Sequence, residues 1–333
     1  MSTLFSHFFT KINRITPLEH KFTEVLDGIA LKPKILYFRG KLPENMAKNI
    51  NKSSSRSTKI RPKTVAIVGS RHNTSYGEEV AYNLAYKLAK RGVIIVSGLA
   101  YGIDSISHQG CLDADGVTVA VLGNPIDHIH PSKHTNLACE IVKKGGAIIS
   151  EYPPANSKDD YYAPGEYLAR SGQRRIEYKT SFLYRNRLIS GLSDLVVIVE
   201  AAEQSGSLNT ATHALEQGKT VFAVPGNITN PYSQGCNKLI KQGAIPYTSP
   251  EDVLQELFPE DYTKKHQKLR QRQLFGDTDV ETKILQAIAK GCRSGEEIMT
   301  KTQLPPEVFN QAVTLLEIKS RLRSLGLNRW GLV

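Results

Sequence analysis

The stretch Thr64-Val-Ala-Ile-Val-Gly-Ser-Arg71 decides the fold class of this chain. Its run from Val65 to Val68 is apolar throughout and rich in β-branched residues, which predicts a strand buried on both faces of a parallel sheet. The strand ends in Gly69-Ser70-Arg71, where the glycine permits a sharp turn. Ligands of open α/β sheets bind at this carboxyl edge, because the following helix presents unpaired N–H groups to anions. The stretch is typical of a phosphate-facing edge and, equally, of an ordinary tight turn between a strand and a helix.

The pattern of the first strand returns further along the chain. A segment of helical spacing leads to a second apolar run, Val93 to Val96, which ends in Ser97-Gly98. Further strand-type runs alternate with segments of helical spacing, and they lie at 117–122, 147–150, 195–199 and 221–224. This alternation predicts an α/β domain over 64–258 with an extended Rossmann-like, doubly wound and mainly parallel sheet.

The flanks of this domain differ from it in composition. Residues 1–63 are predicted to form an N-terminal extension and basic linker, with a short helix at 20–29 and a strand at 35–39. Residues 259–278 are predicted to form a charged linker. Three amphipathic segments and a closing strand over 279–333 predict a small C-terminal winged-helix domain, although a three-helix module for protein contacts has the same pattern.

The net charge of +11 indicates a polyanionic partner, but its distribution limits that inference. Residues 1–64 carry 13 Lys and Arg against 4 Asp and Glu, and residues 259–333 carry 13 against 9, so the remaining core is close to neutral. A DNA site in the core must therefore rest on local residues. No apolar run approaches the roughly 20 residues of a membrane span. The four cysteines show no C-x-x-C spacing, so we expect no metal site, no disulfide framework and a reducing, cytoplasmic location.

Three strand ends that contain glycine are expected to meet at one edge of the parallel sheet. They are Gly69-Ser70-Arg71, Ser97-Gly98 and Ser205-Gly206-Ser207. Backbone N–H groups and hydroxyls suit phosphate oxygens, and Arg71 can hold a phosphate bidentately. The sequence has neither a G-x-G-x-x-G turn after the first strand nor a Walker lysine motif, so no dinucleotide and no other cofactor is expected.

A second candidate region combines an aromatic ring with positive charge. Phe182 stands close to Arg185 and Arg187, and such a combination is typical of single-stranded nucleic-acid binding. The alternative is a core phenylalanine, with arginines that pair with Asp194 or Glu200.

Candidates for catalysis or metal binding are few. Asp104 is expected to cap a helix. Glu200 and Glu203 suit acid–base chemistry and helix capping equally well. Four histidines lie near one another in sequence, but their spacing favours loop or surface roles over a metal site; they are His108, His128, His130 and His134.

Over about residues 24–250 the sequence resembles the DprA/Smf family, the DNA-processing proteins of natural transformation. The resemblance is carried, in order, by Val65-Ala-Ile-Val-Gly-Ser-Arg71, Ser97-Gly-Leu-Ala-Tyr-Gly-Ile-Asp104, Ser150-Glu-Tyr-Pro153, Arg185-Asn-Arg-Leu-Ile-Ser-Gly-Leu-Ser193, Ser205-Gly-Ser-Leu-Asn-Thr-Ala211 and Val224-Pro-Gly226. Residues 279–333 are similar to the winged-helix domain of that family. Two departures lie next to these motifs: the segment 155–181 is longer than the loop usual in the family, and Leu183 stands where proline is common.

The resemblance implies a non-enzymatic, cytoplasmic protein that binds and protects incoming single-stranded DNA, forms a homodimer and helps to load the RecA recombinase. In this interpretation Arg71 clamps a phosphate, Arg185 and Arg187 neutralise the next phosphates, and Phe182 stacks on a base. The implied DNA-binding residues are Gly69, Ser70, Arg71, Ser97, Gly98, Phe182, Arg185, Asn186, Arg187, Ser205, Gly206 and Ser207. The alternative is a nucleotide-processing enzyme, similar to a phosphoribohydrolase, with Glu216 as the helix-borne carboxylate.

Overall fold

The computed structural model of the protein describes residues 11–44, 61–157, 163–168, 174–260 and 275–332. The chain divides into two units, one ending at Leu257 and one beginning at Phe258. Most of the expected basic segment 49–63 and of the expected charged linker 259–278 lies outside the described residues.

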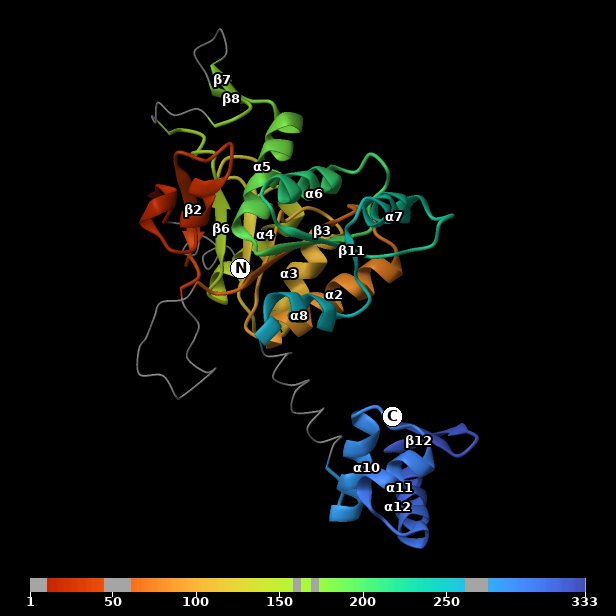
Figure 1. Cartoon of the computed structure of the whole chain (residues 1–333). Coiled ribbons are helices and arrows are strands. Elements are labelled where there is room, and N and C mark those ends of the chain that lie inside the picture. Colours follow the sequence, from red (N-terminus) through yellow and green to blue (C-terminus); the bar gives the residue numbers. More distant parts are fainter. Residues whose placement is uncertain (1–10, 45–60, 158–162, 169–173, 261–274, 333) are drawn as a thin grey trace. The chain divides into compact units, whose positions relative to one another are not determined.

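The first unit is built on one sheet, whose described strands are ordered β1-β2-β6-β5-β4-β3-β9-β10-β11 (Figure 1). Strand β3 has β4 on one side and β9 on the other, so the strand order reverses beside it. All pairs from β6 to β11 along this order are parallel, and only β1 and β2 run antiparallel to their neighbours. The predicted doubly wound, mainly parallel sheet is therefore confirmed. The strands are β1 (Asn13–Ile15), β2 (Leu36–Gly40), β3 (Thr64–Gly69), β4 (Ile94–Ser97), β5 (Thr118–Leu122), β6 (Ala147–Ser150), β9 (Leu195–Val199), β10 (Thr220–Ala223) and β11 (Ile245–Pro246).

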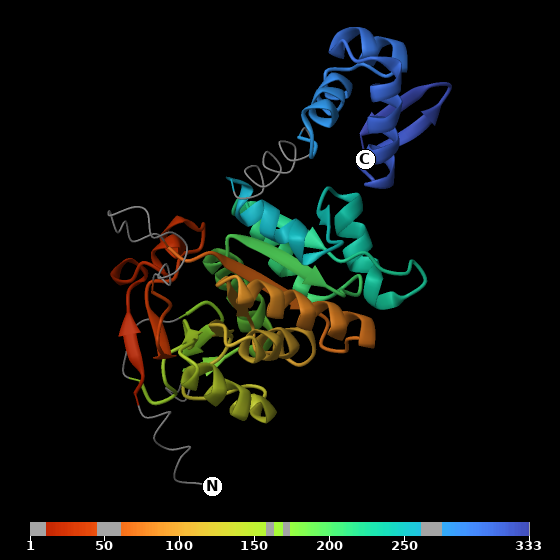
Figure 2. The same ribbon diagram turned by 90° about the horizontal axis from the view of Figure 1, so that it is seen from below.

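Helices cover both faces of this sheet (Figures 1 and 2). On one face α2 packs against α3 and α8, and on the other face α5 packs against α6. Leu188 and Leu192 of α5 are buried together with Val196 and Ile198 of β9, so the sheet and helix share one apolar core. The helices are α2 (Ser75–Lys90), α3 (Ile103–Asp113), α4 (Thr135–Lys143), α5 (Tyr178–Leu192), α6 (Gly206–Glu216), α7 (Gln234–Lys241) and α8 (Pro250–Leu257).

The expected N-terminal extension contributes to the main sheet. Strand β2 pairs with β6, and the helix expected at 20–29 is a short 3-10 helix, η2 (Glu24–Gly28). Phe22 and Leu26 are fully buried in the core that contains α5. Leu26 packs so closely on α5 that a Cβ atom at Gly191 would lie 2.6 Å from it. The first unit therefore begins well before Thr64.

The long segment expected at 155–181 contains a small antiparallel hairpin. Its strands are β7 (Glu166–Leu168) and β8 (Arg174–Ile176), and the hairpin leads directly into α5. In Figure 1 it projects from the top of the unit, beyond the end of α5.

In its described part, the second unit contains three helices followed by a hairpin, which is the element order predicted for a winged helix. Its core is apolar, and the rings of Phe309 and Trp330 meet edge to face at 5.6 Å. In neither unit is a described helix long and apolar enough to cross a membrane. The elements are α10 (Asp279–Ala289), α11 (Gly295–Thr302), α12 (Pro306–Ile318), β12 (Leu322–Gly326) and β13 (Arg329–Leu332).

Candidate functional site

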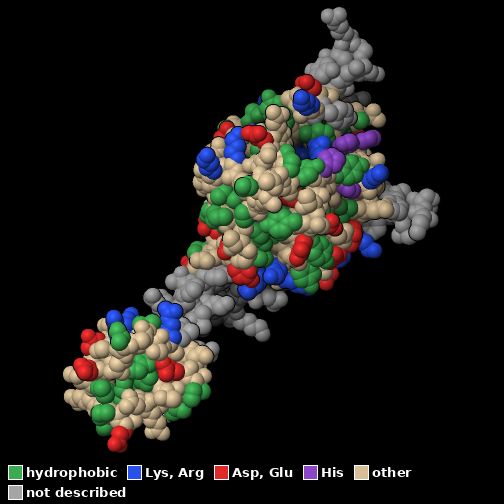
Figure 3. Space-filling model, turned by 90° about the vertical axis from the view of Figure 1, so that its right-hand side faces the viewer, with side chains coloured by type: hydrophobic (Ala, Val, Ile, Leu, Met, Phe, Trp, Pro, Cys, Tyr) green, Lys and Arg blue, Asp and Glu red, His purple; other side chains and the backbone are tan. Residues whose placement is uncertain are grey.

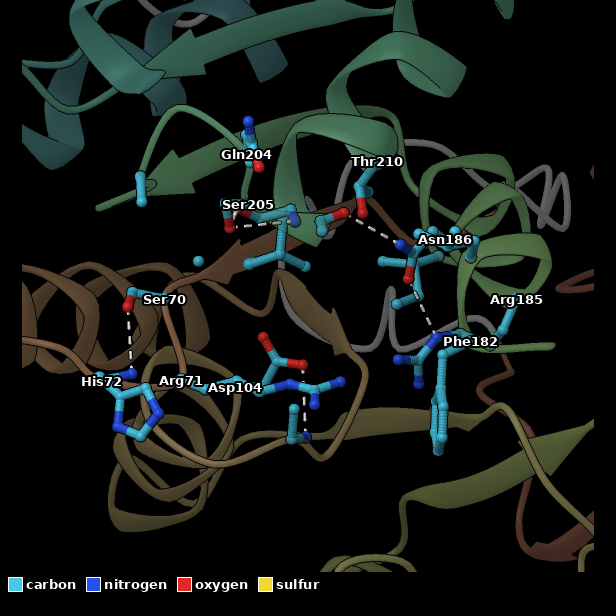
Figure 4. Close-up of a pocket in the computed structure, with 18 of the residues that line it drawn as sticks. Ser70, Arg71, His72, Asp104, Phe182, Arg185, Asn186, Gln204, Ser205 and Thr210 are labelled. Carbon is cyan, nitrogen blue, oxygen red and sulfur yellow. Dashed lines mark hydrogen bonds between the residues drawn. The ribbon is translucent and has the colours of Figure 1, made fainter. Parts of the chain in front are cut away.

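A pocket of about 770 Å³ lies at the carboxyl edge of the sheet, beside the point where the strand order reverses (Figure 4). Its walls come from the turn after β3, from the first half of α5 and from the turn before α6. Many of the side chains that line it are shown in Figure 4, and the predicted residues among them are Gly69, Ser70, Arg71, Phe182, Arg185, Asn186, Ser205, Gly206 and Ser207.

The turn after β3 forms the first wall. Gly69 is required there, because a Cβ atom would lie 1.8 Å from the carbonyl oxygen of Val199. The Ser70 hydroxyl accepts a hydrogen bond from the His72 N–H at 3.0 Å, which shapes the turn. Arg71 is exposed, and its guanidinium carbon lies 5.9 Å from the centre of the Phe182 ring. The turn therefore presents a cation to the pocket from a rigid strand end.

Glu200 holds the start of α2 in place. Its carboxylate accepts hydrogen bonds from the Thr74 N–H at 2.8 Å and from the Thr74 hydroxyl at 2.5 Å. The carboxylate is buried and a Cβ atom at Gly77 would collide with it. Of the two roles open to Glu200 in the sequence, capping is the one that these contacts support.

A buried arginine and a buried aspartate support the floor of the pocket. The Arg185 guanidinium donates to the carbonyl oxygen of Gly98 at 2.9 Å and also to that of Val121. Burial lowers the pKa of Arg185 to about 10, and the charge of Asp104 opposes this shift. Asp104 accepts the N–H of Gly98 at 3.1 Å, and its pKa is raised by burial. Arg185 is thus a fixed cation 5.6 Å from the Phe182 ring centre, rather than a mobile surface charge.

The start of α6 forms the opposite wall. The Ser205 hydroxyl caps the helix by accepting the Ser207 N–H at 3.3 Å. The Asn186 side chain donates to the carbonyl oxygen of Gly206 at 3.2 Å, which ties α5 to this turn. A Cβ atom at Gly206 would meet nothing within 4 Å, so the helix start is open towards the pocket. An open helix N-terminus favours anions.

Three of the predicted residues have other tasks. The Ser97 hydroxyl is buried and donates to the carbonyl oxygen of Ile67 at 2.7 Å, and the Gly98 N–H is engaged by Asp104. Arg187 is buried in an ion pair of 2.7 Å with Glu151. This corrects the expectation that Arg187 neutralises a phosphate. Residues two apart on a helix point in different directions, so Arg187 cannot face the pocket together with Arg185.

The structure also brings residues to the pocket that sequence reasoning missed. Lys179 lies almost one turn before Phe182 on α5, and this helical spacing was a usable signal. The pocket is also lined by His72, Thr210 and Tyr232. Their positions in the pocket depend on how the helices and strands pack.

The residues considered for catalysis lie in structural settings. The expectation that Asp104 is the N-cap of a helix is wrong. The N-cap of α3 is Gly102, and Asp104 lies two residues later, in the first turn. His108 is fully buried beside Thr118, and burial lowers its pKa to about 3. Glu216 lies at the far end of α6 from the pocket, 3.2 Å from His213. Among the described residues no cluster of metal-ligating side chains occurs.

Comparison with known proteins identifies the family. The model of the family "DNA recombination-mediator protein A" matches residues 13–258 of this chain. The chain belongs to this family. The match begins at β1 and includes every wall of the pocket, whereas the second unit lies outside it from Pro259 onward. The resemblance to DprA/Smf proteins is confirmed.

Named relatives and solved structures agree with the family assignment. The chain is 47% identical to Protein Smf of Escherichia coli, over 58% of this chain and 46% of the relative. It is 40% identical to the DNA processing protein DprA of Bacillus subtilis, over 58% of each chain. The chain therefore spans about half the length of these curated relatives.

Two solved structures share the fold of this chain. DNA processing protein A of Streptococcus pneumoniae aligns with a TM-score of 0.57 and 31% identity, over 76% of both chains. DNA processing protein A of Helicobacter pylori, described for its unique single-stranded DNA binding mode, aligns with a TM-score of 0.56 and 28% identity, over 77% of this chain and 98% of that one.

Proposed function

We propose that this protein binds single-stranded DNA in the pocket at the sheet edge and acts as a recombination mediator, not as an enzyme. The observation that carries the proposal is Arg71, an exposed cation at a strand end that forms no ion pair with any described residue. It stands beside the Phe182 ring and across from the open start of α6. The binding mode described for the Helicobacter pylori protein supports the choice of ligand.

In this proposal each wall of the pocket has one task. Arg71 binds a phosphate bidentately, and the N–H groups at the start of α6 favour the same anion. Phe182 offers its ring to a base, since a base stacked on an aromatic side chain contributes about 1–3 kcal/mol without sequence preference. Arg185 adds positive potential at the floor of the pocket, and the carbonyl oxygens of Gly98 and Val121 keep its guanidinium in place. None of these contacts needs a proton transfer or a bond to break.

The wider role is proposed from family membership. We infer that the protein protects incoming strands and helps to load the RecA recombinase, as a homodimer in the cytoplasm. The second unit, with the element order of a winged helix, would contact duplex DNA or a protein partner.

A filter-binding comparison of matched single-stranded and double-stranded oligonucleotides tests the choice of ligand. We expect clear preference for the single strand, because the pocket contacts a base face that a duplex hides. Equal affinity for both forms would contradict the mediator proposal.

A second assay tests the absence of turnover. The protein is incubated with nucleoside monophosphates, and free base is measured for wild type and Glu216→Gln. We expect no release, because Glu216 is exposed and lies at the opposite end of α6 from Ser205. Rapid release that depends on Glu216 would establish the phosphoribohydrolase alternative instead.

A further inference from the structure

Exposed histidines gather beside the pocket. His72 follows β3 and lines the pocket, while His128 and His130 lie on the loop between β5 and α4. All three side chains are exposed. Figure 3 shows histidine side chains clustered in one place on the face in view, next to Lys or Arg side chains. Neutral imidazoles in such a place can become cations near physiological pH.

His130 shares an aromatic neighbour with both arginines of the pocket. Its ring centre lies 5.5 Å from that of Phe182, at an interplanar angle of 40°. Arg71 and Arg185 lie 5.9 Å and 5.6 Å from the same Phe182 ring. The His130 side chain is therefore within reach of a strand that places a phosphate on Arg71 and a base on Phe182.

The charged surroundings of His130 are positive. The pKa of His130 is lowered by burial, then by the charge of Arg71, and then by His128. His128 lies on its own loop, Arg71 on the loop after β3, and Arg185 on α5 across the Phe182 ring. Of these groups, Arg71 and His128 disfavour the protonated form of His130 while the site is empty. A phosphate bound there would reverse this balance, because an opposite charge favours the protonated imidazole.

His134, four residues along the same chain segment, has a different role. Its Nδ1 atom lies 2.9 Å from the carbonyl oxygen of Leu99, and its ring meets that of Tyr101 edge to face at 5.0 Å. These contacts attach the loop to the rest of the unit. His130 is therefore held beside Phe182 by a loop that His134 anchors, and His128 lies on the same loop.

We propose that His130, with His128 on the same loop, forms a second phosphate subsite, which takes the phosphate next to the one on Arg71 and holds it with the protonated His130 imidazole. The inference rests on the proposed single-stranded DNA function and adds a property to it: binding takes up protons. Affinity for DNA therefore rises as the pH falls from the raised imidazole pKa of the complex towards the lowered pKa of His130 in the free protein. An imidazole whose pKa rises by about one unit on binding contributes about tenfold in affinity once it is protonated.

The test is a titration of a fluorescent single-stranded oligonucleotide at fixed ionic strength, at about pH 7.5 and about pH 5.5. Wild type, His128→Gln/His130→Gln and the control His213→Gln are compared. His213 is a matched control, because it is a histidine of α6 whose side chain pairs with Glu216 away from the pocket. We expect wild type and the control to tighten by about tenfold on acidification, and the double variant by no more than about twofold.

A calorimetric measurement avoids reliance on the variants. Binding enthalpies of wild type in buffers of different ionisation enthalpy at about pH 6.5 give the protons taken up. Proton uptake on binding is expected, and zero uptake would overturn the subsite. A double variant that keeps most of the pH dependence would overturn it as well. If wild type fails to bind single strands at either pH, the proposed function itself is refuted.

Discussion

Arg71 at the sheet-edge pocket and Lys319 of the C-terminal unit are both basic side chains, but their surroundings differ. Arg71 is exposed and has no carboxylate partner within the described ranges. On the C-terminal unit, Lys319 directly follows α12 and lies 2.7 Å from Asp277 and 2.8 Å from Glu281. A surface attracts a polyanion through the charges that its own carboxylates leave uncompensated. We therefore expect the pocket of the first unit to be the better DNA site.

The exposed side of α12 supports the same contrast. Leu315 and Ile318 are 42% and 74% exposed, and the helix carries Glu307 and Glu317. An apolar and acidic helix surface is a poor footprint for the phosphate backbone of DNA. We therefore expect the first unit, and not α12, to bind DNA.

The largest effect is expected from Arg71→Ala. It removes a charge-assisted contact of roughly 1.5–3 kcal/mol, which is about one to two decades of single-stranded DNA affinity. Arg71→Lys should recover only part of this loss, because it keeps the charge but not the bidentate fork. The matched control is Arg323→Ala, an exposed arginine of β12, for which we expect almost no change. Equal losses of single-stranded DNA affinity for Arg71→Ala and Arg323→Ala would contradict the expectation that the first unit holds the main DNA site.

A smaller loss is expected from the basic segment of the N-terminal part. Lys52, Arg56 and Lys59 lie outside the described residues, so this prediction rests on the sequence. Neutralising all three should cost less affinity at physiological salt than Arg71→Ala, because charges farther than about 8 Å from the phosphates are screened. A salt titration checks this, since each lost phosphate contact reduces the slope by about 0.7. If the triple variant binds single-stranded DNA more weakly than Arg71→Ala, the main site lies in this basic segment instead.

Removal of residues 279–333 should change single-stranded DNA affinity by only a few-fold. The pocket is complete within the first unit, and every residue that lines it precedes Leu257. Filter binding of the truncated chain measures the change. A loss of about a hundredfold, or about 2.7 kcal/mol, would show that the main site lies in the second unit.

The smallest effect on DNA is expected from Lys319→Met, which should leave affinity unchanged while lowering the melting temperature of the second unit. The pKa of Asp277 is lowered by its hydrogen bond to Lys319, so this stabilisation is present above the ordinary value of 3.8 and is lost as the pH falls through the lowered one. The pKa of Lys319 is raised by Asp277 and Glu281, so its contribution is lost only at a pH above 10.5. Calorimetry at neutral and acidic pH tests this, and a variant as stable as wild type at neutral pH would contradict it.

The sequence allowed the sheet to be predicted because each parallel strand is a continuous apolar run. It did not reveal that β1 and β2 join the same sheet, since strand-type residues do not specify the partner strand. The site was predictable where residues follow strand ends, as at Arg71 and Ser205. It was not predictable where contacts between residues far apart in the sequence decide the role of a side chain. Arg187 is an example, because it forms a buried ion pair with Glu151.

The edges of the main sheet have a consequence for how crowded copies of the protein behave. One outermost strand, β1, has three residues, and the other, β11, has two, of which one is Pro246. Short edge strands and proline offer few backbone donors to a foreign chain. The apolar strands that build the core are therefore shielded from edge-to-edge pairing with the sheet of another copy.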